Sequence, residues 1–190
     1  MMSESNVKVR AGFKRMDEST AEDWTVIMGH DGALAVLPDR ILDQLRLLDS
    51  EESGFAVDRL THSLQTAHLA ELDGRDDAYV ICALVHDIGD VLGPLNHADI
   101  AAAVVRPWVS DAYHWMVQQH GVFQGFYFWH HIGGDQNARD AFRGNEYYDL
   151  AEEFVRKYDM VAFDEDYATP PLEHFEPLVR SFFAGHPQSG

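Results

Sequence analysis

Apolar residues recur along this chain at the three- and four-residue spacing of one helical face, and no segment alternates apolar and polar positions as a half-buried strand does. After Pro38, for example, Ile41, Leu42, Leu45 and Leu48 fall on one face. Capping residues and glycines indicate where the helices begin and end. We expect helices at residues 19–27, from 38 to a break at 53–54, 58–72, 76–88, from 96 or 99 to 106, 110–120, 148–159 and 172–183, and the aromatic segment 121–134 can continue the helix before it.

These elements predict an all-α fold, in which residues 1–190 form a single helical bundle. We expect its core at about residues 30–185 and a loosely ordered segment at residues 1–18. The first ten residues are polar and charged, unlike a signal peptide, and the longest apolar run, residues 78–85, is too short to span a membrane. The single cysteine, Cys82, excludes an internal disulfide and favours a cytoplasmic protein.

The formal net charge of −18 narrows the range of partners. Nucleic acids and anionic membranes are bound by clustered Lys and Arg, so this charge argues against both. A small anionic substrate needs a local basic pocket, because the overall field of the protein repels it. The acidity can also serve solubility alone.

His86 and Asp87 stand side by side at the end of the apolar run 78–85. Burial of both side chains is costly unless each finds a partner, and a metal ion satisfies both. Successive residues point about 100° apart on a helix, so the two can address different sides of a metal pair. Four imidazoles and two carboxylates are enough for two ions, with Asp87 as the bridge, and the candidate ligands are His62, His86, Asp87, His97, His120 and Asp159.

The other histidines have simpler interpretations. We treat His68, His114 and His174 as satisfied core residues, which is the usual role of a single histidine on an apolar helix. His130 and His131 are the main rivals for a ligand role, and their alternative is a supporting or surface position. Imidazole and carboxylate donors without cysteine suit Fe, Mn, Zn or Mg. Such a centre can bind an anion, lower the pKa of a water or, with iron, bind O2.

The order and spacing of the six candidate ligands resemble those of the HD-domain superfamily, named for its adjacent His and Asp. Within it, the chain resembles the oxygenases with a mixed-valence diiron site. These include myo-inositol oxygenase and the enzymes that cleave the C–P bond of 2-amino-1-hydroxyethylphosphonate and of its trimethylammonio relative. The likeness covers about residues 55–180 and includes segments 62–67, 157–159 and 173–177. It implies two iron ions, Fe(II)/Fe(III) in the active state, bound by the six residues.

Several further residues are expected at the substrate. Arg156, three residues before Asp159, matches an arginine that binds phosphonate in this family, and one helical turn brings it to the same cavity. Gln65 lies one turn after His62 and Gln124 one turn after His120, so both are candidate substrate-binding residues.

Two positions depart from the pattern of this family. Asp90 stands where inositol oxygenase has Lys and the aminophosphonate enzyme has His. An acidic side chain there favours a cationic substrate, and Asp87 and Asp90 are the carboxylates expected to take part in catalysis. No Tyr precedes Tyr79, so the chain either lacks the Tyr and Glu that gate the second iron in the aminophosphonate enzyme or supplies a gate from elsewhere, with His30 and Glu52 as candidates.

Aromatic residues are concentrated between positions 108 and 129, among them Trp108, Trp115, Phe123, Phe126, Tyr127, Phe128 and Trp129. Some of them can form a cage for a quaternary ammonium group. The alternative is that they belong to the core or to a homodimer interface. A cation site together with Arg156 fits a small zwitterionic phosphonate. The resemblance then implies a diiron oxygenase that uses O2 to cleave the C–P bond of a 1-hydroxy-2-(trimethylammonio)ethylphosphonate-type substrate, giving glycine betaine and phosphate. The alternative is a metal-dependent HD phosphohydrolase acting on a nucleotide or phosphomonoester. A complete ligand set argues against a third class, a non-catalytic regulatory module.

Overall fold

The structure, a computed structural model, describes residues 10–29, 32–49, 54–185 and 187, and every regular element in this part of the chain is helical. The all-α fold predicted from the sequence is therefore confirmed. The α-helices are α1 (Ala21–Met28), α2 (Gly32–Ala35), α3 (Leu37–Arg46), α4 (Arg59–Leu72), α5 (Asp77–Val85), α6 (His97–Val105), α7 (Asp111–Phe128), α8 (Tyr148–Phe154) and α9 (Leu172–Ala184). The described residues also form the 3-10 turns η1 (Met16–Glu18), η3 (Trp129–His131) and η4 (Ala138–Phe142) and the π-helical turn η5 (Val155–Asp159).

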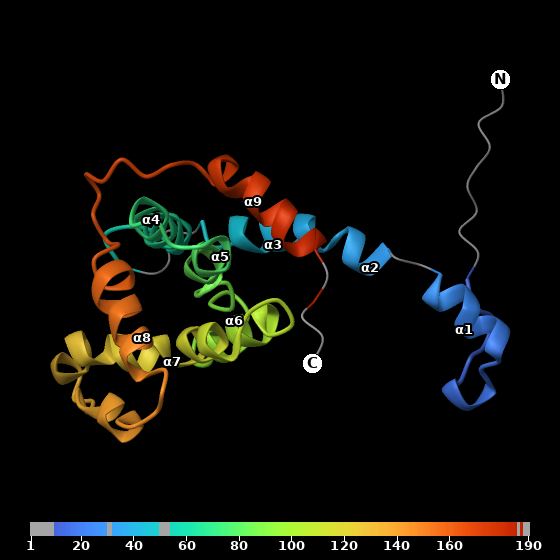
Figure 1. The fold of residues 1–190 in the computed structure, drawn as a ribbon, viewed down its shortest axis with the longest axis horizontal. Helices are drawn as coiled ribbons and strands as arrows, with labels where there is room; N and C mark the ends of the chain where they lie inside the picture. The colour runs from blue at the N-terminus through green and yellow to red at the C-terminus, as the bar shows by residue number, and fades with distance from the viewer. Residues whose placement is uncertain (1–9, 30–31, 50–53, 186, 188–190) are drawn as a thin grey trace.

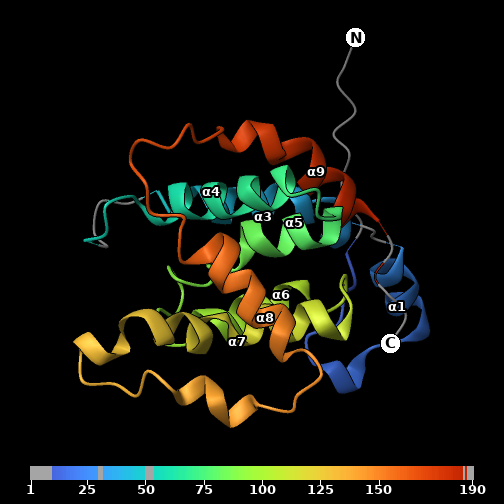
Figure 2. The ribbon, with the colours of Figure 1, turned by 60° about the vertical axis from the view of Figure 1, so that its left-hand side comes forward.

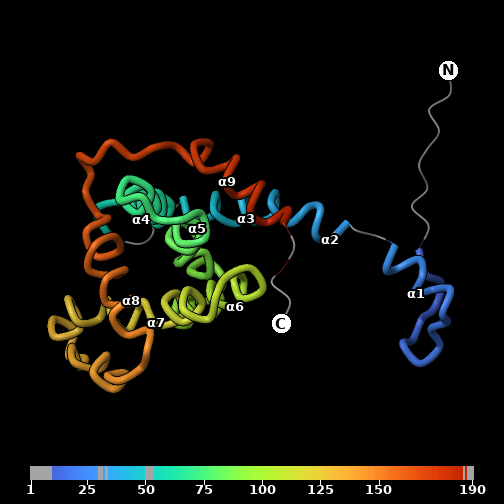
Figure 3. The backbone as a smooth tube through the Cα atoms, in the orientation of Figure 1, coloured from blue at the N-terminus to red at the C-terminus, as the bar shows by residue number. Residues whose placement is uncertain are grey.

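Helix α5 is the centre of the bundle. Residues 79–85 are all buried, because this apolar sequence leaves no polar face to meet water. The helix packs against α4, α7 and α9 (Figure 1). Figure 2 shows α3, α4 and α5 in one layer, α9 above it and α6 with α7 below it, while α8 crosses between the layers. Helix α1 lies apart from this bundle (Figure 3).

Helix α5 ends earlier than the sequence predicts. We expected it to continue to Ile88, but it stops at Val85, with His86 as its C-cap. The backbone then turns more tightly: Ile88 N donates to Val85 O at 3.0 Å, and Asp90 N donates to Asp87 O at 2.9 Å. These bonds span three residues instead of four, so the chain leaves the helix where the two candidate ligands stand.

The turn after α5 passes very close to the start of α6. A Cβ atom at Gly89 would lie 2.6 Å from His97 O and 2.7 Å from the Cβ of Ile100. Both are atoms of a packed helix, which cannot move aside as a flexible side chain could. Glycine is therefore needed to bring the turn and His97 together.

Gly89→Ala is expected to destabilise the protein by about 1–3 kcal/mol, the usual cost of overpacking. For a domain of this size that lowers the melting temperature by several degrees, roughly 2–4 °C per kcal/mol. The same displacement moves His97, so the metal content should fall as well. Thermal unfolding followed by circular dichroism, together with metal analysis, checks both effects. Gly121→Ala is the control, since a Cβ atom there meets nothing within 4 Å.

Helices α7 and α8 also differ in detail from the helices expected from the sequence. Helix α7 runs without a break to Phe128, so the aromatic segment does continue the helix that begins after the Ser110 cap. The helix expected at 148–159 is α8 followed by the π-helical turn η5, in which Met160 N donates to Val155 O at 2.9 Å. This bond spans five residues, which widens the turn just before the loop that follows. No helix among the described residues has the length and apolar character needed to cross a membrane.

Candidate metal centre

The structure brings together all six candidate ligands named from the sequence. His62 comes from α4, His86 and Asp87 from the end of α5, His97 from the first turn of α6, His120 from α7 and Asp159 from the end of η5. Five of these residues are at most 3% exposed, while the His97 side chain is 22% exposed. The ligands therefore lie deep in the bundle, with one imidazole reaching the surface side.

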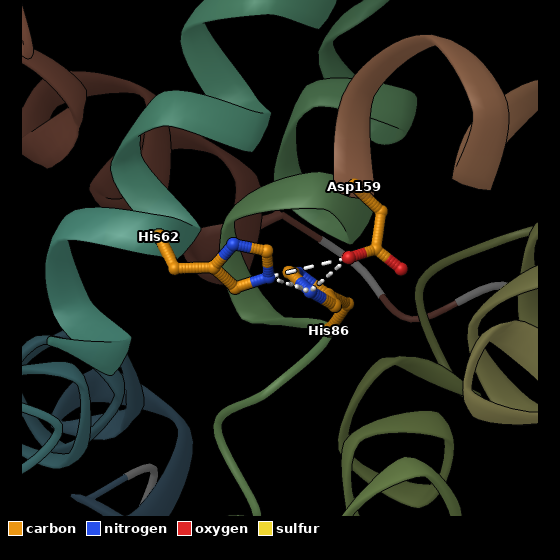
Figure 4. Close-up of side chains that lie close together, drawn as sticks. All are labelled: His62, His86 and Asp159. Atoms are coloured by element: carbon orange, nitrogen blue, oxygen red, sulfur yellow. Dashed lines mark hydrogen bonds and ion pairs between the residues drawn. The ribbon is translucent and has the colours of Figure 1, made fainter. Parts of the chain in front are cut away.

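The first group of ligands surrounds the most buried position. His62 Nε2 lies 3.1 Å from His86 Nε2, and Asp159 Oδ1 lies 3.3 Å from the first nitrogen and 3.8 Å from the second (Figure 4). Ligand atoms about 2.1 Å from one ion and roughly 90–110° apart would lie about 3.0–3.4 Å from each other. Most of the observed spacings are of this size.

Asp87 connects this group to a second one. His97 Nε2 and His120 Nε2 lie 3.2 Å apart, and each is 3.3 Å from Asp87 Oδ1. The other oxygen, Oδ2, lies 3.6 Å from both His62 Nε2 and His86 Nε2. Each oxygen of one carboxylate thus faces one imidazole pair, which is the arrangement of a bridging ligand.

The second nitrogen of each imidazole fixes its tautomer. The Nδ1 atoms lie 2.7–3.0 Å from backbone carbonyl oxygens of Ala162, Ala83, Pro94 and Val117. A carbonyl can only accept, so each Nδ1 carries a proton, and in the neutral imidazole each Nε2 then presents a lone pair. Two facing lone pairs at hydrogen-bond distance repel each other. A cation between them relieves that repulsion, and backbone contacts of this kind are typical of histidines that bind metals.

Asp159 supplies an independent sign that a partner belongs here. Its Oδ1 accepts a hydrogen bond from Gln124 Nε2 at 2.6 Å, but its buried Oδ2 has no hydrogen-bond partner. A buried carboxylate oxygen without a partner is costly. The nitrogen and oxygen donors fit iron, manganese or zinc, and the orphaned oxygen fits a coordinated ion.

The ionisation of the buried groups also suits a metal. Burial lowers the pKa of His86 to about 4, so its imidazole is neutral at pH 7. Burial alone would raise the pKa values of Asp87 and Asp159, but the neighbouring imidazoles outweigh it and both pKa values are lowered. Burial opposes protonation of His120, yet the hydrogen bond with Asp87 outweighs it and raises its pKa. A cation bound at Nε2 needs the neutral imidazole, so metal binding would compete with protonation of His120.

A cavity of about 720 Å³ opens beside the centre. It is lined by the polar side chains of Arg59, His97 and Gln124, among others, and by aromatic side chains: Phe55, Tyr127, Phe128, Trp129 and Phe163. The ring of Phe163 stacks on His62, with centroids 4.2 Å apart and planes 19° apart. The ligands therefore have an apolar cover on one side and access for a small molecule on the other.

Two of the predicted substrate residues do not reach this cavity. Arg156 is exposed, its Nε lies 3.2 Å from Glu152 Oε1, and it is not among the lining residues. The expectation assumed a regular helix, whereas the wide π turn points the residue three positions before Asp159 outward. Asp90 does not line the cavity either, because α5 ends before it, and its carboxylate faces Arg59 instead.

The two glutamines have different positions. Gln124 lines the cavity and contacts Asp159, as a residue at the substrate should. Gln65 is buried away from the cavity, where its Nε2 donates to Asp164 O at 2.7 Å and to Thr169 Oγ1 at 3.0 Å. It fixes the loop that carries Phe163, so its role is structural.

The rival ligands and the candidate gates named from the sequence do not take part in the site that the structure describes. His130 and His131 are exposed in η3 and contact each other, with ring centroids 3.8 Å apart. They lie outside the ligand groups identified among the described residues. His30 and Glu52, the candidate gates, lie outside the described residues, as do residues 1–9 of the segment expected to be loosely ordered.

The aromatic cluster divides between cavity and core. Three of its members line the cavity: Tyr127, Phe128 and Trp129. The other four pack elsewhere, because they fall on other faces of the bundle. Trp108 contacts Phe183, Trp115 contacts Phe123 and Phe142, and Phe126 lies under Arg139.

Arg59 is the residue that the sequence reasoning missed. It lies three residues before His62 on α4, and its Nη1 is 3.2 Å from Asp87 Oδ2. The one-turn spacing used to select Gln65 after His62, applied in the other direction, identifies Arg59. Phe55 and Phe163 could not be found in this way, because they lie in loops whose path has no helical pattern.

The family model described as "HD domain" matches residues 59–159, which is more than half of the chain and includes all six ligands. A comparison with curated proteins gave no match.

Proposed function

The chain belongs to the HD-domain family, and on that premise we propose that it is a diiron oxygenase that cleaves the C–P bond of a 1-hydroxyphosphonate. The preferred substrate is 1-hydroxy-2-(trimethylammonio)ethylphosphonate, and the products are glycine betaine and phosphate. The observation that carries this proposal is the pair of imidazole groups on the two oxygens of Asp87, which provides for two ions with one bridge. The buried Cys82 fits a cytoplasmic enzyme.

Two features favour an oxygenase over the alternative, an HD phosphohydrolase. Four imidazoles to two carboxylates suit iron better than magnesium, which prefers oxygen ligands. Among the described residues that line the cavity, Arg59 is the only arginine or lysine. The several phosphates of a nucleotide would find a single cationic side chain here, in a chain whose net charge of −18 repels anions. A single phosphonate group needs only that one cationic side chain.

The residues around the centre have separate tasks in this reaction. When bound, the iron ions would supply O2 chemistry and Lewis-acid contacts for the hydroxyl and phosphonate oxygens of the substrate. Gln124 orients Asp159 by its hydrogen bond, and Phe163 keeps water from one face of His62. Tyr127 and Trp129 line the cavity and would bind the trimethylammonium group by cation–π contacts, whereas the sequence predicted that Asp90 binds this group.

The proposal predicts that turnover consumes one O2 for each phosphate released, because the two oxygens gained appear in the carboxylate and the phosphate. Iron-loaded protein is supplied with the trimethylammonio substrate while O2 and phosphate are both measured. The expected result is equal amounts of each, and no phosphate in anaerobic buffer. Release of phosphate from a nucleotide or phosphomonoester without O2, with Mn²⁺ or Mg²⁺ bound, would instead establish the phosphohydrolase.

A further inference from the structure

Arg59 occupies the end of the cavity next to the metal ligands. It is the first residue of α4, and its side chain is 16% exposed. Its Nη1 lies 3.2 Å from Asp87 Oδ2, the oxygen that faces His62 and His86. The guanidinium is thus one contact away from the centre while still lining the space open to a ligand.

The guanidinium is fixed in place by two neighbours. Phe55 lies against it, with Cζ 4.4 Å from the ring centroid, and Asp90 Oδ2 lies 3.6 Å from Nε. The Nε atom is nevertheless buried without a hydrogen-bond partner. A guanidinium has five N–H groups, and among the described residues only the contact of Nη1 with Asp87 is short enough for a hydrogen bond. The orientation of the guanidinium is set, while other N–H groups have no hydrogen-bond acceptor in this part of the chain.

A cation in this position needs an anion to balance it. Two metal ions beside Arg59 would repel the guanidinium, and Asp87 would share its charge with those ions. An anion between the ions and Arg59 gives both a partner of opposite charge. The planar fork of arginine suits two oxygens of a tetrahedral group in particular.

We propose that Arg59 forms an anion-binding subsite for a tetrahedral oxyanion, phosphonate or phosphate, and that Asp90 and Phe55 are its positioning residues. This gives Asp90 a new role: it holds the residue that binds the anionic end of the substrate, instead of contacting the cationic end. The assignment rests on the proposed function only for the identity of the substrate, because a phosphomonoester would use the same subsite.

The test is binding of inorganic phosphate and of methylphosphonate to the metal-loaded protein, measured by calorimetry, with metal content determined for every variant. Arg59→Gln should weaken binding about tenfold or more, the usual effect of losing a charge-assisted hydrogen bond. Arg156→Gln is the matched control, since that arginine is 52% exposed and pairs with Glu152, and its affinity should be unchanged. Unchanged affinity in Arg59→Gln with full metal content would overturn the proposal.

Two further variants separate this role from a purely structural one. Asp90→Asn should weaken phosphate binding severalfold in the wild-type background but have no added effect together with Arg59→Gln, because it acts through Arg59. If Arg59→Gln loses metal, Arg59→Lys decides: severalfold weaker binding with both ions present supports the subsite, and unchanged binding rejects it. If phosphate binding depends on Arg59 but the iron-loaded protein takes up no O2 with the trimethylammonio substrate, the oxygenase is rejected and the subsite is retained.

Discussion

Asp87→Ala is expected to remove both metal ions and all turnover. Oδ1 lies 3.3 Å from the Nε2 atoms of His97 and His120, and Oδ2 lies 3.6 Å from those of His62 and His86. Loss of the side chain leaves the second position with two imidazoles and no negative charge. The first position keeps three ligands but has a single carboxylate, Asp159, to balance a divalent ion.

The measurement is metal content per chain together with thermal unfolding. Wild-type protein should hold about two ions, as expected for a two-metal site, and Asp87→Ala well under one. The control is Asp90→Ala, which removes a nearby carboxylate that lies 3.6 Å from Arg59 Nε and approaches His97 at Nδ1, at 3.9 Å, and not at the Nε2 atom that faces the centre. That variant should keep both ions. A content near two ions in Asp87→Ala would contradict the bridging assignment.

The buried part of this protein could be predicted from the sequence because its signal is local. The apolar run 78–85 specifies a helix without a polar face, and the His–Asp pair that follows it is costly to bury without a metal. Cap residues such as Asp58 and Ser110 are visible in the sequence and begin the helices that carry His62 and His120.

The substrate side was predicted less well because it depends on where regular helix geometry fails. Asp90 was assigned because it stands at a substrate position of the enzymes that the chain resembles, but α5 ends at Val85 and the turn that carries Asp90 packs closely against His97 and Ile100. Arg156 was assigned by counting three residues on a regular helix, and a π turn intervenes. Packing between distant segments decides both features, and such packing leaves no periodic pattern in the sequence.

The two metal positions should differ in their affinity for an ion, because they have different numbers of ligands and different exposure. The first has His62, His86 and Asp159 as well as Asp87, and all four are at most 3% exposed. The second has His97 and His120 with Asp87, so it has one protein ligand fewer. His97 also lines the cavity, and its side chain is 22% exposed. This leaves the second position open toward the cavity and more easily emptied.

His97→Ala is therefore expected to lose one ion and keep the other, giving about one per chain, while turnover falls by roughly 100-fold or more, since both ions are needed for the reaction. Metal analysis gives the count, and spectroscopy of the iron-loaded protein should show a single uncoupled ion. His130→Ala is the matched control, because this exposed histidine lies outside the ligand groups, and it should keep two ions and full activity.

Loss of both ions in His97→Ala would mean that the first position does not hold an ion when the second is empty. Retention of both would show that His97 is not a ligand. A content of one ion follows only if the four buried ligands around His62 hold a metal by themselves, so this single variant tests the division of the centre into two unequal positions.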